Sequence, residues 1–106
     1  MYLGIDLGTS GVKLLLIDAD QKVVGTTSAS IEVSRPHPGW SEQDPAAWIS
    51  ATRSAIEALK ARHGREFAGI RGIGLSGHMH GATLLGADDG VLRPCILWND
   101  TRSHKE

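Results

Sequence analysis

The sequence has little cysteine, few aromatic residues and almost no net charge. Cys95 is the only cysteine among 106 residues, which excludes an intramolecular disulfide and predicts a reducing compartment, the cytoplasm. The 11 Lys and Arg against 12 Asp and Glu leave a formal net charge of −1, which excludes a dominant basic face for nucleic acid. Asp6 and Lys13 interrupt the apolar residues near the start, so neither a signal peptide nor a membrane span is expected.

Hydrophobic residues and glycine are the well-represented classes. Hydrophobic residues make up 41% of the chain, enough for one core in a chain of single-domain length. The 13 glycines gather in short stretches. Because glycine lets the backbone approach a ligand closely, these stretches are the first places to look for a binding site.

Three strands open the predicted fold. Stretches rich in Val, Leu, Ile and Thr alternate with short turns, and strands with such links pair as an antiparallel meander. Pro36 and Pro38 remove backbone donors, so a loop is expected over residues 35–40. The predicted strands are residues 1–5, 12–17 and 23–33.

A helix over residues 45–62 and further strands follow. Asp44 is suited to cap this helix, Pro45 fits its first turn, and apolar side chains recur on one face at helical spacing. The helix is expected to bury Trp48, Thr52, Ala55, Ile56 and Leu59. A short buried strand is then predicted at residues 70–75, and a strand pair at 82–85 and 91–98 with its hairpin turn at 87–90.

The turn between the first two strands is the first candidate site. Its glycines and hydroxyl residues present amides and hydroxyls to one small volume, which favours an anion such as phosphate. Asp6 is suited to hold a hydrated Mg²⁺ beside the phosphates, and Lys13 to offset charge. An ordinary hairpin with Asp6 bonded to local amides is the alternative. The candidate phosphate-binding residues are Gly8, Thr9, Ser10, Gly11 and Lys13.

Residues 3–13, Leu-Gly-Ile-Asp-Leu-Gly-Thr-Ser-Gly-Val-Lys, closely resemble the first phosphate loop of the FGGY carbohydrate kinases. This family belongs to the actin, hexokinase and Hsp70 ATPase superfamily. The resemblance implies an α/β fold, the ribonuclease-H-like half of the actin-type ATPase, with ATP and Mg²⁺ as cofactors. The segment is not a Walker A loop, because no Gly-Lys-Ser/Thr follows and it joins two strands of a hairpin.

The stretch that follows, residues 72–81, contains glycines and two histidines. Residues 72–77 fit the pattern G-x-G-x-x-G, but the glycines lie within a strand and no helical stripe follows, so NAD binding is rejected. His78 and His80 would lie on one side of an extended segment, yet two neighbouring ligands are too few for a structural zinc site. Hydrogen bonding of a sugar hydroxyl by imidazole is the other functional interpretation.

Residues 76–85, Ser-Gly-His-Met-His-Gly-Ala-Thr-Leu-Leu, sharpen the resemblance. They look like the Ser-Gly-Gln-Met-His-Gly segment of the xylulose-phosphorylating members of the family, whose Met-His pair contacts D-xylulose. The resemblance therefore implies that Met79 and His80 bind the sugar. His78 occupies the position where the family usually has glutamine, so the resemblance implies no role for His78.

Two more segments are similar to the family. Residues 38–45 match the segment that leads into the long helix, and helix capping alone accounts for them. Residues 96–102 match a Trp-x-Asp-x-Arg segment near the sugar pocket, where an indole face packs on a sugar. This match implies that Trp98, Asn99 and Asp100 bind sugar. The alternative is a core Trp98 with a surface pair of Asp100 and Arg102.

Together these segments imply transfer of the ATP γ-phosphoryl group to D-xylulose, giving D-xylulose 5-phosphate. In the family the general base and the adenosine site lie further downstream. Residues 1–106 are therefore expected to be a partial N-terminal kinase domain, inactive alone. Neither nucleic acid nor membrane is an expected partner, and a homodimer is one option for an unfinished sheet. The alternatives are a kinase for glycerol, gluconate or ribulose, an actin-like or Hsp70-like ATPase, and a non-catalytic binding domain.

Overall fold

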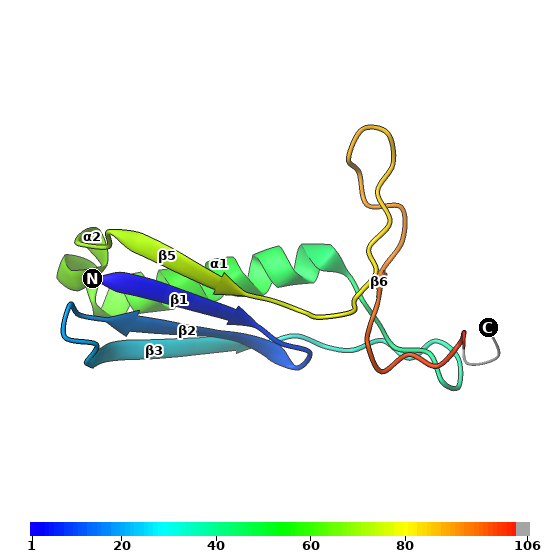
Figure 1. The fold of residues 1–106 in the computed structure, drawn as a ribbon, viewed down its shortest axis with the longest axis horizontal. Coiled ribbons are helices and arrows are strands. Elements are labelled where there is room, and N and C mark those ends of the chain that lie inside the picture. Colours follow the sequence, from blue (N-terminus) through cyan, green and yellow to red (C-terminus); the bar gives the residue numbers. More distant parts are fainter. Residues whose placement is uncertain (104–106) are drawn as a thin grey trace.

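The structure, a computed structural model, describes residues 1–103 as a four-stranded sheet with one long helix along one face (Figure 1). The strand order is β3-β2-β1-β5. The first three strands pair antiparallel, which confirms the predicted meander, and β5 lies parallel to β1. The strands are β1 (Tyr2–Leu7), β2 (Gly11–Ile17), β3 (Val23–Ser30) and β5 (Gly72–Ser76).

The helix α1 (Pro45–Arg62) has the predicted bounds. The Asp44 carboxylate accepts a hydrogen bond from the backbone N–H of Ala46 at 3.0 Å, and Pro45 occupies the first turn, where its missing N–H costs nothing. A short helix that the sequence pattern did not predict, α2 (Gly64–Ala68), follows directly. Past its end, the N–H of Arg71 donates to the carbonyl of Met1 and brings the chain alongside β1.

The core lies between α1 and the sheet. In β2, Val12, Leu14 and Leu16 are at most 1% exposed, while Lys13 between them is exposed, as the period of two in a strand requires. The helix presents Ala51, Ala55 and Leu59 to them, with Trp48 and Ile56 partly buried at the edge. The predicted stripe is therefore correct at Ala55 and Leu59, whereas Thr52 is only half-buried and Ala51 was missed.

The prediction that β5 is a buried strand is wrong. Ile73 is 62% exposed and Leu75 is 79% exposed. Their register partners are Leu3 and Ile5, so they point to the face that α1 occupies, but α1 packs over β2 and β3 instead. An apolar groove of about 590 Å³ is left between α1 and β5.

The strand pair expected over residues 82–98 is also wrong as a ladder. Residues 82–94 form an arm that projects from the body (Figure 1), with single bridges at Leu85–Val91 and Ala82–Ile96. The hairpin turn is where it was expected, because Gly86 donates to the carbonyl of Gly90. The strand β6 (Cys95–Ile96) is two residues long and pairs with β4 (Glu42–Gln43), which the sequence pattern did not predict. An arm that stands clear of the sheet has no neighbour with which to extend its pairing.

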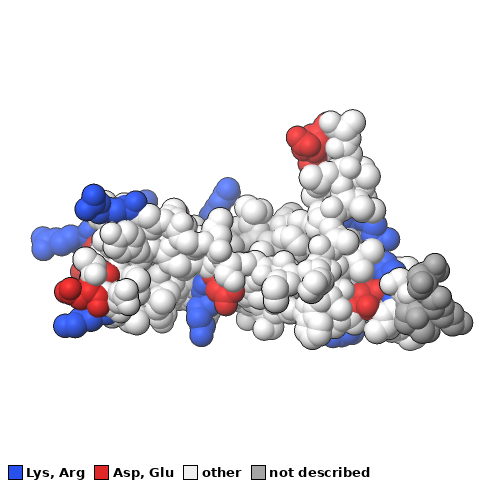
Figure 2. Space-filling model, in the orientation of Figure 1, with Lys and Arg blue, Asp and Glu red and all other residues white. Residues whose placement is uncertain are grey.

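Figure 2 shows charged side chains of both signs at the two ends of this face, with a smaller red and blue group near its middle and a red group at the tip of the arm. Within residues 1–103, none of the helices has the length and apolar character needed to cross a membrane.

Gly11, at the start of β2, has no room for a side chain. A Cβ there would lie 2.5 Å from the carbonyl oxygen of Ala29, whereas a Cβ on Gly74 would meet nothing within 4 Å. We expect Gly11→Ala to lower the free energy of unfolding by about 1–3 kcal/mol, because β3 must shift. Gly74→Ala, the matched control, should change it by less than about 0.5 kcal/mol. Urea unfolding followed by circular dichroism measures both, and equal effects would contradict this packing.

Candidate functional site

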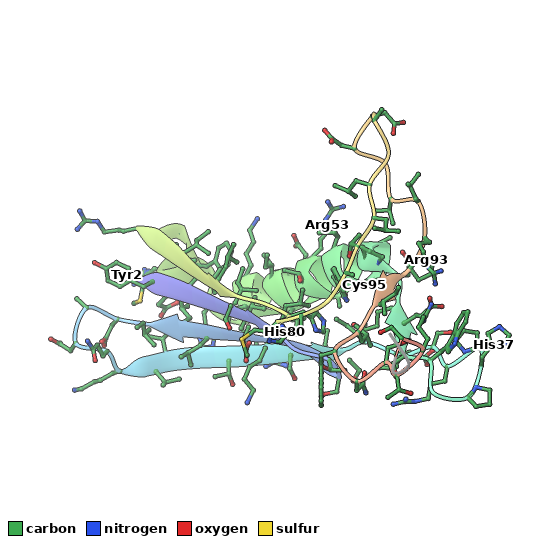
Figure 3. The ribbon with its side chains drawn as sticks, turned by 45° about the vertical axis from the view of Figure 1, so that its right-hand side comes forward. Tyr2, His37, Arg53, His80, Arg93 and Cys95 are labelled. Carbon is green, nitrogen blue, oxygen red and sulfur yellow. The ribbon has the colours of Figure 1, made fainter. Side chains whose placement is uncertain are left out.

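The candidate site is a cleft at the carboxyl ends of β1 and β5. Ligand crevices commonly form where neighbouring parallel strands end. Three segments distant in sequence meet there: the β1–β2 turn, the loop after β5, and the segment after β6. Figure 3 shows His80 on the loop that follows β5. The cleft has a volume of about 310 Å³ and is lined by Asp6, Leu7, Gly8, Thr9, Gly77, His78, Met79, His80 and Trp98.

A second hollow, of about 340 Å³, adjoins the β1–β2 turn on the sheet face opposite α1. Most of the residues that line it are polar or glycine: Ser10, Gly11 and Lys13 meet the serines of β3 there, beside Val12 and Ala29. Asp6 lines both this hollow and the cleft. In the sheet register Asp6 lies opposite Lys13 on one side and Ser76 on the other, so the carboxylate has a cation and a hydroxyl residue as cross-strand neighbours.

The β1–β2 turn is held in one shape by bonds at each of its residues. Gly8 donates its N–H to the carbonyl of Gly11 at 2.8 Å, and Ile31 donates to the carbonyl of Ser10 at 3.0 Å. The Thr9 carbonyl accepts from the Gln43 amide, and the Thr9 hydroxyl accepts from Trp98 Nε1 at 2.9 Å. The turn is thus fixed before any ligand arrives, which lowers the entropic cost of binding.

Gln43 is a functional candidate that sequence reasoning missed. Its side chain is 1% exposed, and its Oε1 accepts from Trp48 Nε1 at 2.9 Å while its Nε2 donates to Thr9. A buried amide with both ends bonded is favourable where an unpaired one would be costly. The only signal for Gln43 in the sequence is that it lies within residues 38–45, which resemble the family. Helix capping by Asp44 was a sufficient explanation for that segment, so Gln43 was given no role.

The sugar-side wall consists of residues 77–80. His80 has a φ of 60°, in the left-handed region, which costs a non-glycine residue about 1–2 kcal/mol; Gln21 and Asp89 share this conformation in turns outside the cleft. Met79 is 75% exposed. The His78 ring lies 5.1 Å from that of Trp48, and its buried Nε2 has no partner within residues 1–103. Burial lowers the pKa of His78, so its imidazole is neutral at neutral pH.

Two predicted sugar-binding residues do not reach the cleft. Trp98 lines it, but Asn99 and Asp100 are absent from its lining. The Asp100 carboxylate accepts from Arg102 Nε at 2.8 Å and from the Ser41 backbone N–H at 2.6 Å, and its side chain is 2% exposed. The Asn99 Oδ1 is buried without a partner in the described part of the chain. The Asp100 carboxylate is therefore engaged in a part-buried ion pair with Arg102 and does not line the cleft.

This ion pair belongs to a larger cluster that fixes the segment after β6. Arg102 also approaches the buried Glu42 at 3.1 Å and lies 3.8 Å over the ring of Trp40. Glu42 forms a second ion pair with Arg93. Burying a carboxylate is costly unless cations compensate it, and two arginines face Glu42, although its buried Oε2 has no hydrogen bond within residues 1–103. The cluster joins residues 40–43 to residues 93–102, and so determines where Trp98 stands.

The surroundings of Asp6 suit a Mg²⁺ ion that arrives bound to a nucleotide better than a metal ion held by protein ligands alone. Within residues 1–103, no group of three or more His, Cys, Asp or Glu is placed to hold a metal. The Asp6 side chain is exposed and has no hydrogen-bond or ion-pair partner in this part of the chain. Mg²⁺ usually keeps several waters and binds one or two carboxylates together with substrate phosphates.

Asp100 generates a prediction about acid stability. The Arg102 side chain, with the donated backbone N–H groups, holds the pKa of Asp100 well below its usual range. A depressed folded-state pKa contributes stability at neutral pH that is lost as the pH falls below about 4, the unfolded value. We therefore expect Asp100→Asn to be less stable than wild type at pH 7 and to lose less stability between pH 5 and pH 2. Urea unfolding across this range checks it, and identical pH profiles would contradict the ion pair.

Comparison with known proteins gives one consistent result. Residues 1–106 match the N-terminal domain of the FGGY family of carbohydrate kinases. The xylulose kinase of Escherichia coli (strain K12) is 52% identical over 106 residues, which are 100% of this chain and 22% of that protein. A crystal structure of a xylulose kinase from Brucella ovis has a TM-score of 0.97 at 71% identity, covering 99% of this chain and 22% of its own. That from Rhodospirillum rubrum has 0.92 at 34% identity, covering 97% and 21%.

These relatives confirm the predicted α/β fold of the actin and hexokinase type. The chain spans about a fifth of the length of the relatives it matches.

Proposed function

The chain belongs to the FGGY family of carbohydrate kinases, and on that premise we propose that residues 1–106 form the N-terminal part of a kinase that phosphorylates D-xylulose. The rest of the catalytic apparatus then lies in other parts of a longer protein. The observation that carries the proposal is the position of Asp6, which lines both the polar hollow beside the turn and the cleft that holds Met79 and His80. Phosphoryl transfer requires the γ-phosphate of ATP in the hollow and the hydroxyl of the sugar in the cleft to meet at one point.

On the nucleotide side, residues 9–11 offer backbone N–H groups and hydroxyls to the terminal phosphates of ATP, whereas the Gly8 N–H is already bonded to the Gly11 carbonyl. Converging amide dipoles favour an anion, and Lys13 adds a positive charge to the same hollow. Asp6 would hold Mg²⁺ through water, and that ion would neutralise charge on the phosphates. Catalysis of phosphoryl transfer is largely positioning and electrostatic stabilisation, which these residues are suited to supply.

On the sugar side, the cleft pairs apolar and polar groups as a polyol requires. The exposed Met79 and the indole of Trp98 provide an apolar surface for the sugar ring or chain, and His80 provides a hydrogen-bonding imidazole. Asp6 is the only carboxylate among the described residues that line the cleft. Since Asp6 already holds the magnesium ion beside the phosphates, the general base is supplied by another part of the longer protein.

The match to xylulose kinases favours D-xylulose over glycerol, gluconate or ribulose, which remain the alternative substrates. The even charge and the single, buried Cys95 favour the cytoplasm as the compartment. A homodimer stays a prediction, to which the uncovered groove beside β5 lends support.

The test is a substrate panel with the intact kinase that contains these residues. ATP-dependent ADP release is measured with D-xylulose, D-ribulose, glycerol and D-gluconate. We expect kcat/KM to be highest for D-xylulose by at least about tenfold, because unpaired polar groups penalise the wrong polyol. The separately purified residues 1–106 should show no turnover. A preference for glycerol or gluconate would contradict D-xylulose as the substrate. Turnover by residues 1–106 alone would contradict the claim that catalysis needs other parts of a longer protein.

A further inference from the structure

The hydrogen bond between Trp98 and Thr9 joins the two sides of the site. Trp98 Nε1 lies 2.9 Å from Thr9 Oγ1, across 89 positions of sequence. An indole N–H only donates, whereas a hydroxyl has one hydrogen to donate and two lone pairs that accept. The Thr9 oxygen must therefore be the acceptor. Its own hydrogen is not used in this bond and stays available to another acceptor.

The described residues leave that hydrogen without an acceptor. Within residues 1–103 the Thr9 hydroxyl donates no hydrogen bond, while its residue lines the cleft beside Asp6. The loop does not turn freely to find a partner, because the Thr9 carbonyl is bonded to Gln43 and Gln43 is bonded to Trp48. A hydroxyl with a fixed oxygen and an unused hydrogen is a donor prepared for an anionic oxygen.

Trp98 itself is held from both sides of the backbone. Leu97 is 2% exposed and donates its N–H to the carbonyl of Ser41 at 2.9 Å, and Asp100 donates to the carbonyl of Leu97 at 3.0 Å. The indole is nevertheless 62% exposed and lines the cleft. The scaffold thus fixes where the indole N–H points and leaves much of the side chain free for a ligand.

From this geometry we propose that Trp98 is a positioning residue for phosphoryl transfer, in addition to being a surface for the sugar. Through its N–H, Trp98 orients the Thr9 hydroxyl as a donor to an oxygen of the transferring phosphoryl group. The inference rests on the proposed kinase function. It differs from a sugar-contact role because it requires the indole nitrogen, and not the aromatic surface alone.

Trp98→Phe in the intact kinase separates these roles, because phenylalanine keeps an aromatic face and loses the N–H. We expect kcat to fall by about tenfold to a hundredfold, the loss expected for a hydrogen bond to a charged group. The KM for D-xylulose should change by less than about threefold, since uniform sugar binding is retained. Tyr2→Phe is the control for loss of one polar hydrogen from an exposed aromatic side chain, because Tyr2 begins β1 and the cleft lies at the other end of that strand, and it should leave kcat unchanged.

A double-mutant cycle supplies the second readout. Thr9→Val removes the hydroxyl and should lower kcat at least as much as Trp98→Phe, whereas Thr9→Ser, which keeps the hydroxyl, should stay within about threefold of wild type. The double variant of Thr9→Val with Trp98→Phe should be no slower than Thr9→Val alone, because the indole then has nothing to orient. If phenylalanine at position 98 unfolds the protein, 3-benzothienylalanine, which replaces the N–H by sulfur, takes its place.

Two results would overturn the proposal. One is a Trp98→Phe variant whose loss lies in the KM for sugar with kcat preserved, and the other is a double variant whose losses multiply. A wrong substrate assignment can be told apart from a wrong role for Trp98, because a wrong substrate shows as a preference of the wild-type enzyme for another polyol. If wild type prefers another polyol, the same variants measured with that polyol still decide whether the indole nitrogen acts on Thr9.

Discussion

The pairing of β1 on both of its edges is the constraint on which the site depends. Antiparallel pairing with β2 places the phosphate-type turn at the end of β1, and parallel pairing with β5 brings the sugar-side loop to the same end. Asp6 is thereby placed between Lys13 and Ser76. A shift of register by one residue would turn Asp6 toward α1 and remove it from both hollows. The buried alternation in β2 against α1 fixes that register.

Outside the sheet, buried polar groups take over the task of fixing geometry. Gln43, Glu42 and Asp100 are almost fully buried, and each bonds to a segment distant in sequence. Such groups stabilise only when their partners are in place, so they favour one arrangement over near alternatives. They hold the segment after β6 in contact with the turn after β1. The strand β6 is only two residues long, so its own pairing contributes little to this placement.

Local patterns predicted the local elements well. A stretch rich in Val, Leu and Ile identified β2, and the Asp44 cap with Pro45 located α1 at its observed bounds. The motif resemblance selected Asp6, Thr9, Met79, His80 and Trp98, and the structure brings these five to one cleft. Because β1 and β5 are adjacent and parallel, residues 70 positions apart become neighbours, and no local pattern contains that information.

The errors arose where a long-range contact decides the outcome. Leu75 has the character of a core residue but lies beyond the reach of α1, and residues 82–94 leave the sheet instead of extending it. Asp100 looks like a ligand for hydroxyls until Arg102 and Ser41 are seen to occupy its oxygens. Gln43 gives the opposite case: its polar side chain gave no sign of being buried, because its partners Thr9 and Trp48 lie on other elements.

The most direct measurement is a crystal structure of the intact kinase with D-xylulose, Mg²⁺ and a non-hydrolysable ATP analogue. We predict the terminal phosphate within hydrogen-bond distance of the backbone amides of residues 9–11, with Asp6 beside the metal and the sugar between His80 and Trp98. A nucleotide phosphate remote from this turn, or a sugar bound outside the cleft, would contradict it.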